Sequence, residues 1–174
     1  MQNGKLELPG NLSIRLAAAA DRAFIEQLYH ASRDDLRLLQ AERDFVEELI
    51  SMQQSARSAA YEEQYPQACN FIVEYLSEPV GRVLVDFGQA QVHVVDIAFS
   101  PKGRGQGYGA AVMRALQQAS RQIMVPMTLW VQRSKPGLRN FYAALGFQSA
   151  GGDAMNEQLI WIPDTLANQA ARPC

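Results

Sequence analysis

Residues 99–109 read Phe99-Ser100-Pro101-Lys102-Gly103-Arg104-Gly105-Gln106-Gly107-Tyr108-Gly109. The apolar run before this stretch is typical of a β-strand, and the spacing of apolar residues after it predicts a long amphipathic helix. A helix begins with unpaired backbone N–H groups and the positive end of its dipole, and glycines let a ligand approach that backbone closely. The stretch therefore predicts a loop that binds a phosphate or diphosphate group. A glycine-rich turn without a ligand is the plain alternative.

The rest of the chain predicts one α/β domain. Its 174 residues are 48% hydrophobic, which is enough for a single core. Patterning predicts strands at residues 13–16, 70–76, 82–87, 91–99, 127–132 and 158–162, and helices after residue 21 and at 42–63, 108–123 and 138–145. In the helix at 42–63, the expected apolar stripe comprises Phe45, Leu49, Met52, Ala56 and Ala59. We expect a single domain over residues 1–174, with loose termini at about 1–11 and 164–174.

Composition excludes several classes of function. Charged residues make up 20% of the chain, the net charge is −2, and acids and bases are interspersed, so we expect no nucleic-acid partner. No long apolar segment or secretion signal is present, which predicts a cytoplasmic protein without a membrane partner. Cys69 and Cys174 lack the spacing of metal ligands, so we expect neither a metal site nor a disulfide framework.

Three kinds of phosphate-binding loop compete for the glycine-rich stretch. Gly105-x-Gly107-x-x-Ala110 satisfies the dinucleotide fingerprint, but no acidic residue follows on the next strand, where such a site needs one. A nucleotide triphosphate loop requires Gly-Lys-Ser/Thr, and the chain has Gly-Ala-Ala at 109–111 instead. The third pattern is Arg/Gln-x-x-Gly-x-Gly/Ala, which Arg104-x-x-Gly107-x-Gly109 matches without a gap.

That third pattern resembles the pyrophosphate loop of the GNAT superfamily of acyl-CoA N-acyltransferases. The strand before the loop resembles the family's fourth strand, and the segment from Phe141-Tyr142 to Gly146-Phe147 is similar to its downstream motif. Lys135 and Leu138 depart from that motif, since Asn and Ala are usual there. The resemblance covers about residues 92–147. It implies an α/β (α+β) GNAT fold, with a mixed, mostly antiparallel sheet of about six to seven strands flanked by about four helices.

The resemblance also implies the co-substrate and its contacts. A neutral amine can attack the acetyl thioester of acetyl-CoA directly, so no Ser or Cys nucleophile is needed. In the family, the fourth and fifth strands splay apart and the fourth strand contacts the pantetheine arm and donates to the oxyanion. The implied coenzyme-binding residues are Ile97, Ala98, Phe99, Arg104, Gly105, Gln106, Gly107, Tyr108 and Gly109, with Lys135, Arg139, Asn140 and Tyr142 on the following helix.

Tyr142 is the first candidate for a catalytic residue, because it matches the family's tyrosine. The departing thiolate needs a proton, and a well-placed phenol with a reference pKa of about 10 can supply it. Packing in the core beside Phe141 and Leu145 is the alternative role. A general base must remove the proton from the amine, and His93, Asp96 and Glu74 are candidates, with His93 and Asp96 preferred. For His93 the alternative is an exposed strand histidine, and for Asp96 a hydrogen bond to a loop.

The acceptor is predicted to be a small-molecule or peptide amine, bound by a monomer or homodimer. Acidic side chains crowd the N-terminal helices and could attract a cationic amine, although solvated helix faces explain them equally simply; they are Asp34, Asp35, Glu42, Glu47, Glu48, Glu62 and Glu63. The expected function is transfer of an acetyl group from acetyl-CoA to an amine. The alternatives are a non-catalytic acyl-CoA-binding or sensing domain and a dinucleotide-dependent oxidoreductase.

Overall fold

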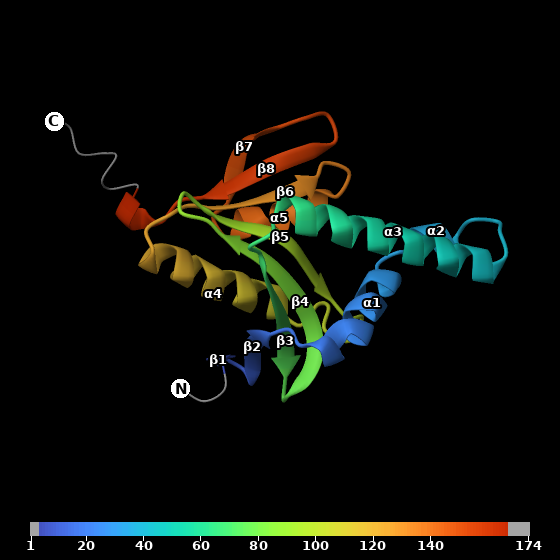
Figure 1. Cartoon of the computed structure of the whole chain (residues 1–174). Helices are drawn as coiled ribbons and strands as arrows, with labels where there is room; N and C mark the ends of the chain where they lie inside the picture. Colours follow the sequence, from blue (N-terminus) through green and yellow to red (C-terminus); the bar gives the residue numbers. More distant parts are fainter. Residues whose placement is uncertain (1–3, 167–174) are drawn as a thin grey trace. The chain divides into compact units, whose positions relative to one another are not determined.

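A computed structural model of the chain describes residues 4–166 (Figure 1). Within these residues, eight strands form one sheet in the order β1-β2-β3-β4-β5-β6-β8-β7. Neighbouring strands pair in antiparallel fashion at β1–β2, β2–β3, β6–β8 and β7–β8, whereas β5 and β6 are parallel. The predicted mixed, mostly antiparallel α/β sheet is confirmed, with eight strands instead of six to seven. Of the C-terminal segment expected to be loose, about residues 164–174, residues 164–166 are helical and the rest lies outside the described residues.

The chain divides into two compact units, and the division falls within strands β4 and β5. The first unit comprises residues 1–84 and 96–106, and the second comprises residues 85–95 and 107–174. The elements of the first unit are β1 (Lys5–Leu8), β2 (Leu12–Leu16), η1 (Ala19–Asp21), α1 (Arg22–Ala31), α2 (Asp34–Arg37), α3 (Arg43–Gln64), β3 (Cys69–Tyr75), most of β4 (Glu78–Phe87) and the end of β5 (Val92–Phe99). Those of the second are the remainder of β4 and β5, α4 (Tyr108–Gln122), β6 (Met127–Gln132), α5 (Pro136–Ala144), β7 (Gln148–Gly152) and β8 (Asn156–Trp161).

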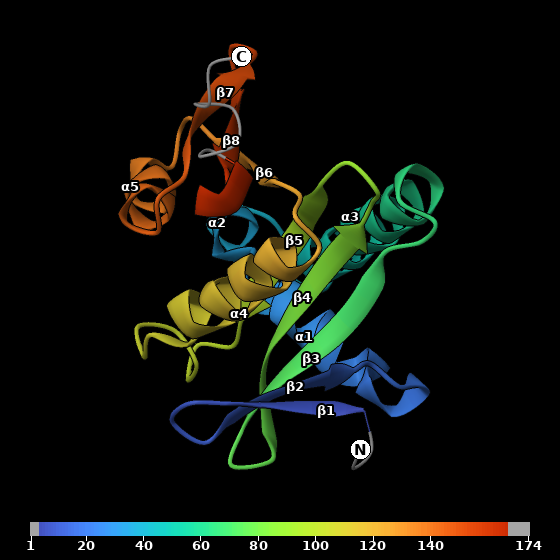
Figure 2. The same ribbon diagram turned by 90° about the vertical axis from the view of Figure 1, so that its left-hand side faces the viewer.

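The expectation of a loose N-terminus at about residues 1–11 is wrong for residues 5–8, which form the first strand of a hairpin. Strand β1 pairs with β2, from Lys5 opposite Arg15 to Leu8 opposite Leu12 (Figure 2). The turn between them uses the positive φ of Gly10, 79°, which glycine adopts without steric strain. Pairing with strand β2 holds this segment in place, and neither the strand propensity of its residues nor a sequence motif predicts the strand.

Strand β4 begins at Glu78, four residues before the predicted start at residue 82. Pro79 and Gly81 argue against a strand in the sequence, because both residues weaken strand interiors. Gly81 is needed for a packing reason: a Cβ there would lie 2.5 Å from the ring of Phe99. The glycine therefore lets the last side chain of β5 lie across β4.

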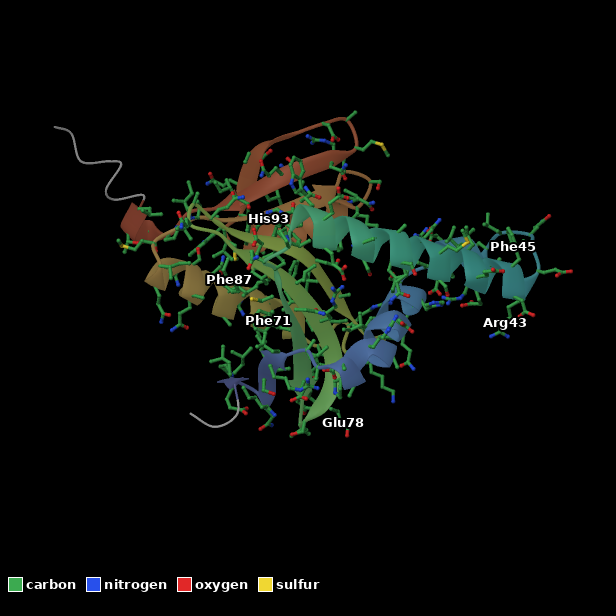
Figure 3. The ribbon with its side chains drawn as sticks, in the orientation of Figure 1. Arg43, Phe45, Phe71, Glu78, Phe87 and His93 are labelled. Atoms are coloured by element: carbon green, nitrogen blue, oxygen red, sulfur yellow. The ribbon has the colours of Figure 1, made fainter. Side chains whose placement is uncertain are left out.

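The predicted apolar stripe of α3 is wrong. Phe45 and Met52 are 59% and 64% exposed, and Figure 3 shows Phe45 near the first turn of the helix. The buried apolar residues are instead Val46 and Ile50, one helical position further on. Helix α3 packs against α1 and α2 within the first unit, and this contact selects the buried side. Two stripes with helical spacing coexist in the sequence, so spacing alone cannot choose between them.

The second unit contains the parallel pair β5–β6 and the antiparallel strands β8 and β7. Helix α5 ends at Ala144, two residues before Gly146, the predicted stop, whose φ of 90° favours glycine. A Cβ at Gly146 would lie 3.3 Å from the indole of Trp161, so the neighbouring strand β8 also demands a small residue. Strand β7, exposed throughout, is paired only with β8 and carries no apolar signal that could predict it.

Candidate functional site

The glycine-rich loop leads into α4 through left-handed glycines. Gly105 and Gly107 have φ angles of 70° and 80°, and Gly107 is the N-cap of the helix. Among the described residues, only their chain neighbours come within 4 Å of the position that a Cβ would take at either glycine. The first turn of α4 follows directly, with its N–H groups unable to find intrahelical partners. This arrangement offers an anion an open main chain and the positive end of a helix dipole.

The base of the loop is anchored by the residues that precede these glycines. The N–H groups of Gly103 and Arg104 donate to Ser100 O at 2.9 and 3.1 Å. The Arg104 side chain turns to main-chain carbonyls, with Nε 3.1 Å from Phe99 O and Nη2 3.4 Å from Ala31 O. Arg104 therefore ties the loop to the ends of β5 and α1.

The residues predicted to bind the coenzyme fit that group at this loop. A diphosphate needs several N–H donors and close approach to the backbone, and the positive φ angles with open space at Gly105 and Gly107 supply both. On the strand before the loop, the parallel pairing of β5 with β6 covers only residues 92–94 and 127–129. Both strands continue beyond it, to Phe99 and Gln132. The predicted thioester contacts, Ile97 to Phe99, lie in the part of β5 beyond this pairing.

Asp96, a predicted base, is the centre of an ion-paired cluster in the first unit. Its Oδ1 accepts a hydrogen bond from Arg57 Nη2 at 2.9 Å, and its Oδ2 from Arg82 Nη1 at 3.3 Å. Arg57 Nε also donates to the hydroxyl of Tyr61 at 2.8 Å, and burial, aided by Asp96, raises the pKa of that phenol. The partners of Asp96 are thus side chains of α3 and β4, and not the loop that the sequence analysis offers as the alternative. Arg57 and Arg82 are not among the site residues predicted from the sequence.

A second stripe on α3 could have revealed Arg57 and Tyr61. The buried residues Val46 and Ile50 continue at helical spacing through Gln53, Arg57 and Tyr61. Polar residues therefore occupy the side of α3 that begins as its buried face. A polar continuation of an apolar stripe is the pattern expected where a helix passes from a core to a binding site.

His93, the other predicted base, is buried in the second unit, with 5% of its surface exposed. The alternative of an exposed strand histidine is therefore wrong. Its Nδ1 lies 2.8 Å from Thr128 Oγ1, which is its register partner on the parallel strand β6. Burial lowers the pKa of His93 below its ordinary value of 6.5, and the charge of Asp86 acts in the opposite direction. A neutral imidazole at pH 7 follows.

Replacing His93 by glutamine should change how stability depends on pH. The unfolded chain binds a proton near pH 6.5 and the folded protein only at lower pH. The stabilisation from neutral His93 is therefore complete above pH 6.5 and is lost as the pH falls through the folded pKa. Relative to His93→Gln, the wild type should lose up to about 1.4 kcal/mol of unfolding free energy per pH unit in that window. Urea denaturation at a series of pH values measures this, and parallel curves for the two proteins would contradict it.

The predicted residues of α5 differ in their surroundings. Tyr142 is 5% exposed, and its ring makes edge contacts with Phe141 and Phe147 at centroid distances of 5.0 and 5.6 Å. The core packing named as its alternative role is therefore present, and it holds the ring in one orientation. Arg139 Nε donates to the buried carboxylate of Glu157 at 2.9 Å. The remaining two, Lys135 and Asn140, are exposed.

Ion pairs involve Glu74, the third candidate base, and some of the acidic side chains of the N-terminal helices. Glu74 is buried and accepts hydrogen bonds from Arg15 and Lys5, at 2.7 and 3.0 Å. On α2 and α3, Asp34 and Glu47 both pair with Arg37, at 2.9 and 2.8 Å. Glu74 is thus neutralised within the protein, whereas the single charge of Arg37 is shared by two carboxylates and offsets only part of the acidic charge of these helices.

Two kinds of feature are absent from the described residues. Within residues 4–166, no three His, Cys, Asp or Glu side chains are grouped as metal ligands would be. No helix in that range is both long and apolar enough to cross a membrane.

Comparison with known proteins identifies the family. A model of the Acetyltransferase (GNAT) family matches residues 21–147. No curated protein sequence matches the chain. Similar solved structures include the PaiA N-acetyltransferase of Thermoplasma acidophilum in complex with coenzyme A, which is 13% identical with a TM-score of 0.65 over 87% of this chain and 99% of that one.

Two further structures have different stated acceptors. One is apo FdhC, a nucleotide-linked sugar GNAT, which is 18% identical with a TM-score of 0.65 over 98% of both chains. The other is the spermidine/spermine N-acetyltransferase SpeG from Vibrio cholerae, with manganese ions, which is 17% identical with a TM-score of 0.60 over 92% of this chain and 97% of that one. At these identities the likeness shows the fold alone. The match to the family model covers well over half of the chain, and the protein therefore belongs to the acetyltransferase (GNAT) family and is an acyltransferase.

Proposed function

We propose that the protein transfers an acetyl group from acetyl-CoA directly to the nitrogen of an amine acceptor. The observation that carries this proposal is the open main chain at Gly105 and Gly107, two left-handed glycines at the start of α4. A diphosphate bound there would accept hydrogen bonds from the loop and from the first turn of the helix. The similar PaiA N-acetyltransferase structure contains coenzyme A, which supports the same ligand here.

The main chain of β5 is proposed to activate the thioester. Ile97, Ala98 and Phe99 lie on β5 beyond its pairing with β6, so their main-chain groups are the nearest candidates for hydrogen bonds to the pantetheine arm and to the thioester oxygen. Fixed N–H donors stabilise the negative charge that develops on this oxygen while the amine attacks. The thioester supplies an activated acetyl group, and the chain's own contribution is alignment and charge stabilisation.

Proton transfers complete the proposed reaction. Tyr142 is proposed to give a proton to the thiolate that leaves. For the base, Asp96 has the advantage of position because it adjoins Ile97, whereas His93 is neutral but four residues away, about 13 Å along the strand. The pH–rate profiles of His93→Gln and Asp96→Asn separate the two, because only loss of the base removes the acidic limb of the profile.

One family model spans residues 21–147, which include parts of both units. We propose on this ground that residues 1–174 act as one acetyltransferase domain.

A comparison of acetyl-CoA with NAD tests the proposal directly. Acetyl-CoA at a hundred times its Kd should raise the free energy of unfolding by about 2.7 kcal/mol, which a thermal-shift assay detects, and NAD should produce no shift. Free coenzyme thiol should then appear when the protein, acetyl-CoA and a panel of amines are combined. Stabilisation by NAD alone would overturn the proposal. Binding of acetyl-CoA without turnover of any amine would favour a non-catalytic acyl-CoA-binding domain.

A further inference from the structure

Two arginines share one carboxylate on the strand that precedes the glycine-rich loop. Arg57, from α3, and Arg82, from β4, each donate to one oxygen of Asp96. Among residues 4–166, Asp96 is the only carboxylate ion-paired with either guanidinium. Two positive charges and one negative charge therefore leave this cluster with a surplus of one positive charge.

The surplus sets this cluster apart from other ion pairs of the same unit. Arg15, for example, bonds to two carboxylates, Asp21 and Glu74, at 2.7 Å each. Arg82 is also largely withdrawn from solvent, with 17% of its side chain exposed. Burial lowers the pKa of its guanidinium, against the attraction of Asp96. A partly buried cation that shares its single counterion is stabilised by a second anion.

The two guanidiniums are held in place and still have N–H groups to donate. Arg57 lies over the rings of Tyr61 and Tyr29, at 5.2 and 5.7 Å from their centroids, and Arg82 Nε donates to Asn70 Oδ1 at 2.8 Å. In the part of the chain that the structure describes, Nη1 of Arg57 and Nη2 of Arg82 donate to no protein atom. No fully buried side-chain nitrogen of a non-exposed residue there lacks a partner, so Nη2 of Arg82 is accessible, and the Arg57 side chain is 43% exposed.

The cluster adjoins the main chain that is proposed to contact the thioester. Asp96 directly precedes Ile97, and consecutive Cα atoms are about 3.8 Å apart. An acceptor whose nitrogen reaches the thioester would have the rest of its body within a few ångströms of Arg57 and Arg82. A polyamine would meet positive charge in this position, whereas an anionic substituent would meet two guanidinium groups.

We propose that the amine acceptor carries a carboxylate, which Arg57 and Arg82 bind while its amine faces the thioester. The guanidinium fork matches the planar carboxylate and allows two parallel hydrogen bonds. The inference rests on the proposed function, because it needs acetyl transfer at the end of β5. It names the acceptor class as small amino acids or similar amino-carboxylates.

Matched acceptors test this selectivity. Rates of acetylation are measured for a panel of amino acids and for the corresponding amino acid amides, which differ only by loss of the carboxylate charge. We expect the kcat/KM ratio of acid to amide to fall about tenfold or more in Arg57→Gln, the size of one charge-assisted hydrogen bond. Arg57→Lys keeps the charge and should retain part of the preference. Comparing ratios cancels the intrinsic reactivity of each amine.

Arg37→Gln is the matched control, since it also removes one positive charge from the first unit, where Arg37 pairs with Asp34 and Glu47. It should leave the ratio unchanged. Equal ratios in the wild type and Arg57→Gln would overturn the inference, as would a wild-type preference for polyamines. If Arg57→Gln lowered kcat/KM more for an amine that carries a phosphate than for one that carries a carboxylate, the carboxylate assignment would be overturned and the bound group would be a phosphate.

A measurement without turnover separates this inference from the proposed function. The Nε–Hε NMR signals of Arg57 and Arg82 should shift when an N-acetyl amino acid is added and stay in place with its amide. Shifted signals without acetylation of any amine would retain the anion site and refute acetyl transfer. Acetylation of amines with unshifted arginine signals would do the reverse.

Discussion

Replacing Tyr142 by phenylalanine should lower kcat for acetyl transfer by about 100-fold and leave the KM for acetyl-CoA nearly unchanged. The phenol is proposed to protonate the departing thiolate, and general acid catalysis of this kind contributes factors of about 10² to 10⁴. The substitution removes one hydroxyl and keeps the ring that packs between Phe141 and Phe147. Steady-state kinetics with the best amine of the panel measure both constants.

A second hydroxyl deletion serves as the control for this experiment. Tyr75→Phe removes the same group from the last residue of β3, whereas Asn70, which contacts Arg82, lies near the start of that strand. This substitution should leave kcat unchanged. Melting temperatures of both variants report any loss of folding. Equal kcat values for Tyr142→Phe and the wild type would remove Tyr142 from the mechanism and leave it the core-packing role that its 5% exposure already shows.

Gly107→Val should abolish measurable binding of acetyl-CoA. The residue has a φ of 80°, and a side chain there would project into the open space that the diphosphate is proposed to fill. Left-handed backbone in a residue other than glycine destabilises the fold by roughly 1–2 kcal/mol, so a folded but non-binding protein is expected. Isothermal titration of the variant with acetyl-CoA measures the loss of affinity, and circular dichroism verifies the fold.

Gly10→Val provides a control with the same local geometry. Gly10 has a φ of 79°, and only its chain neighbours lie within 4 Å of the position of a Cβ. This substitution should cause a similar loss of stability in the turn between β1 and β2, with unchanged affinity for acetyl-CoA. If both variants bound acetyl-CoA as tightly as the wild type, the loop at Gly107 would not be the pyrophosphate site.

The order of strands and helices could be predicted from the sequence because periodicity and punctuation agree over most of the chain. The glycines at 105 and 107 indicate left-handed backbone, and Gly146 predicts the end of α5 to within two residues. Strands β1 and β7 escaped prediction, since hairpin pairing forms them and their own residues carry little signal. The start of β4 was not predicted for a related reason: the strand needs a glycine at position 81 because the ring of Phe99, which is distant in sequence, packs there.

The candidate site divides in the same way. The loop, its position between a strand and a helix, and the family could be predicted from the sequence, because these depend on residues close together in the chain. Contacts between distant elements, in contrast, bring Arg57 and Arg82 to Asp96 and bury His93 beside Thr128. Charge surplus and burial depend on what surrounds a side chain, and these neighbours are distant in sequence. Arg57 and Arg82 are 39 and 14 residues from Asp96, and Thr128 is 35 residues from His93.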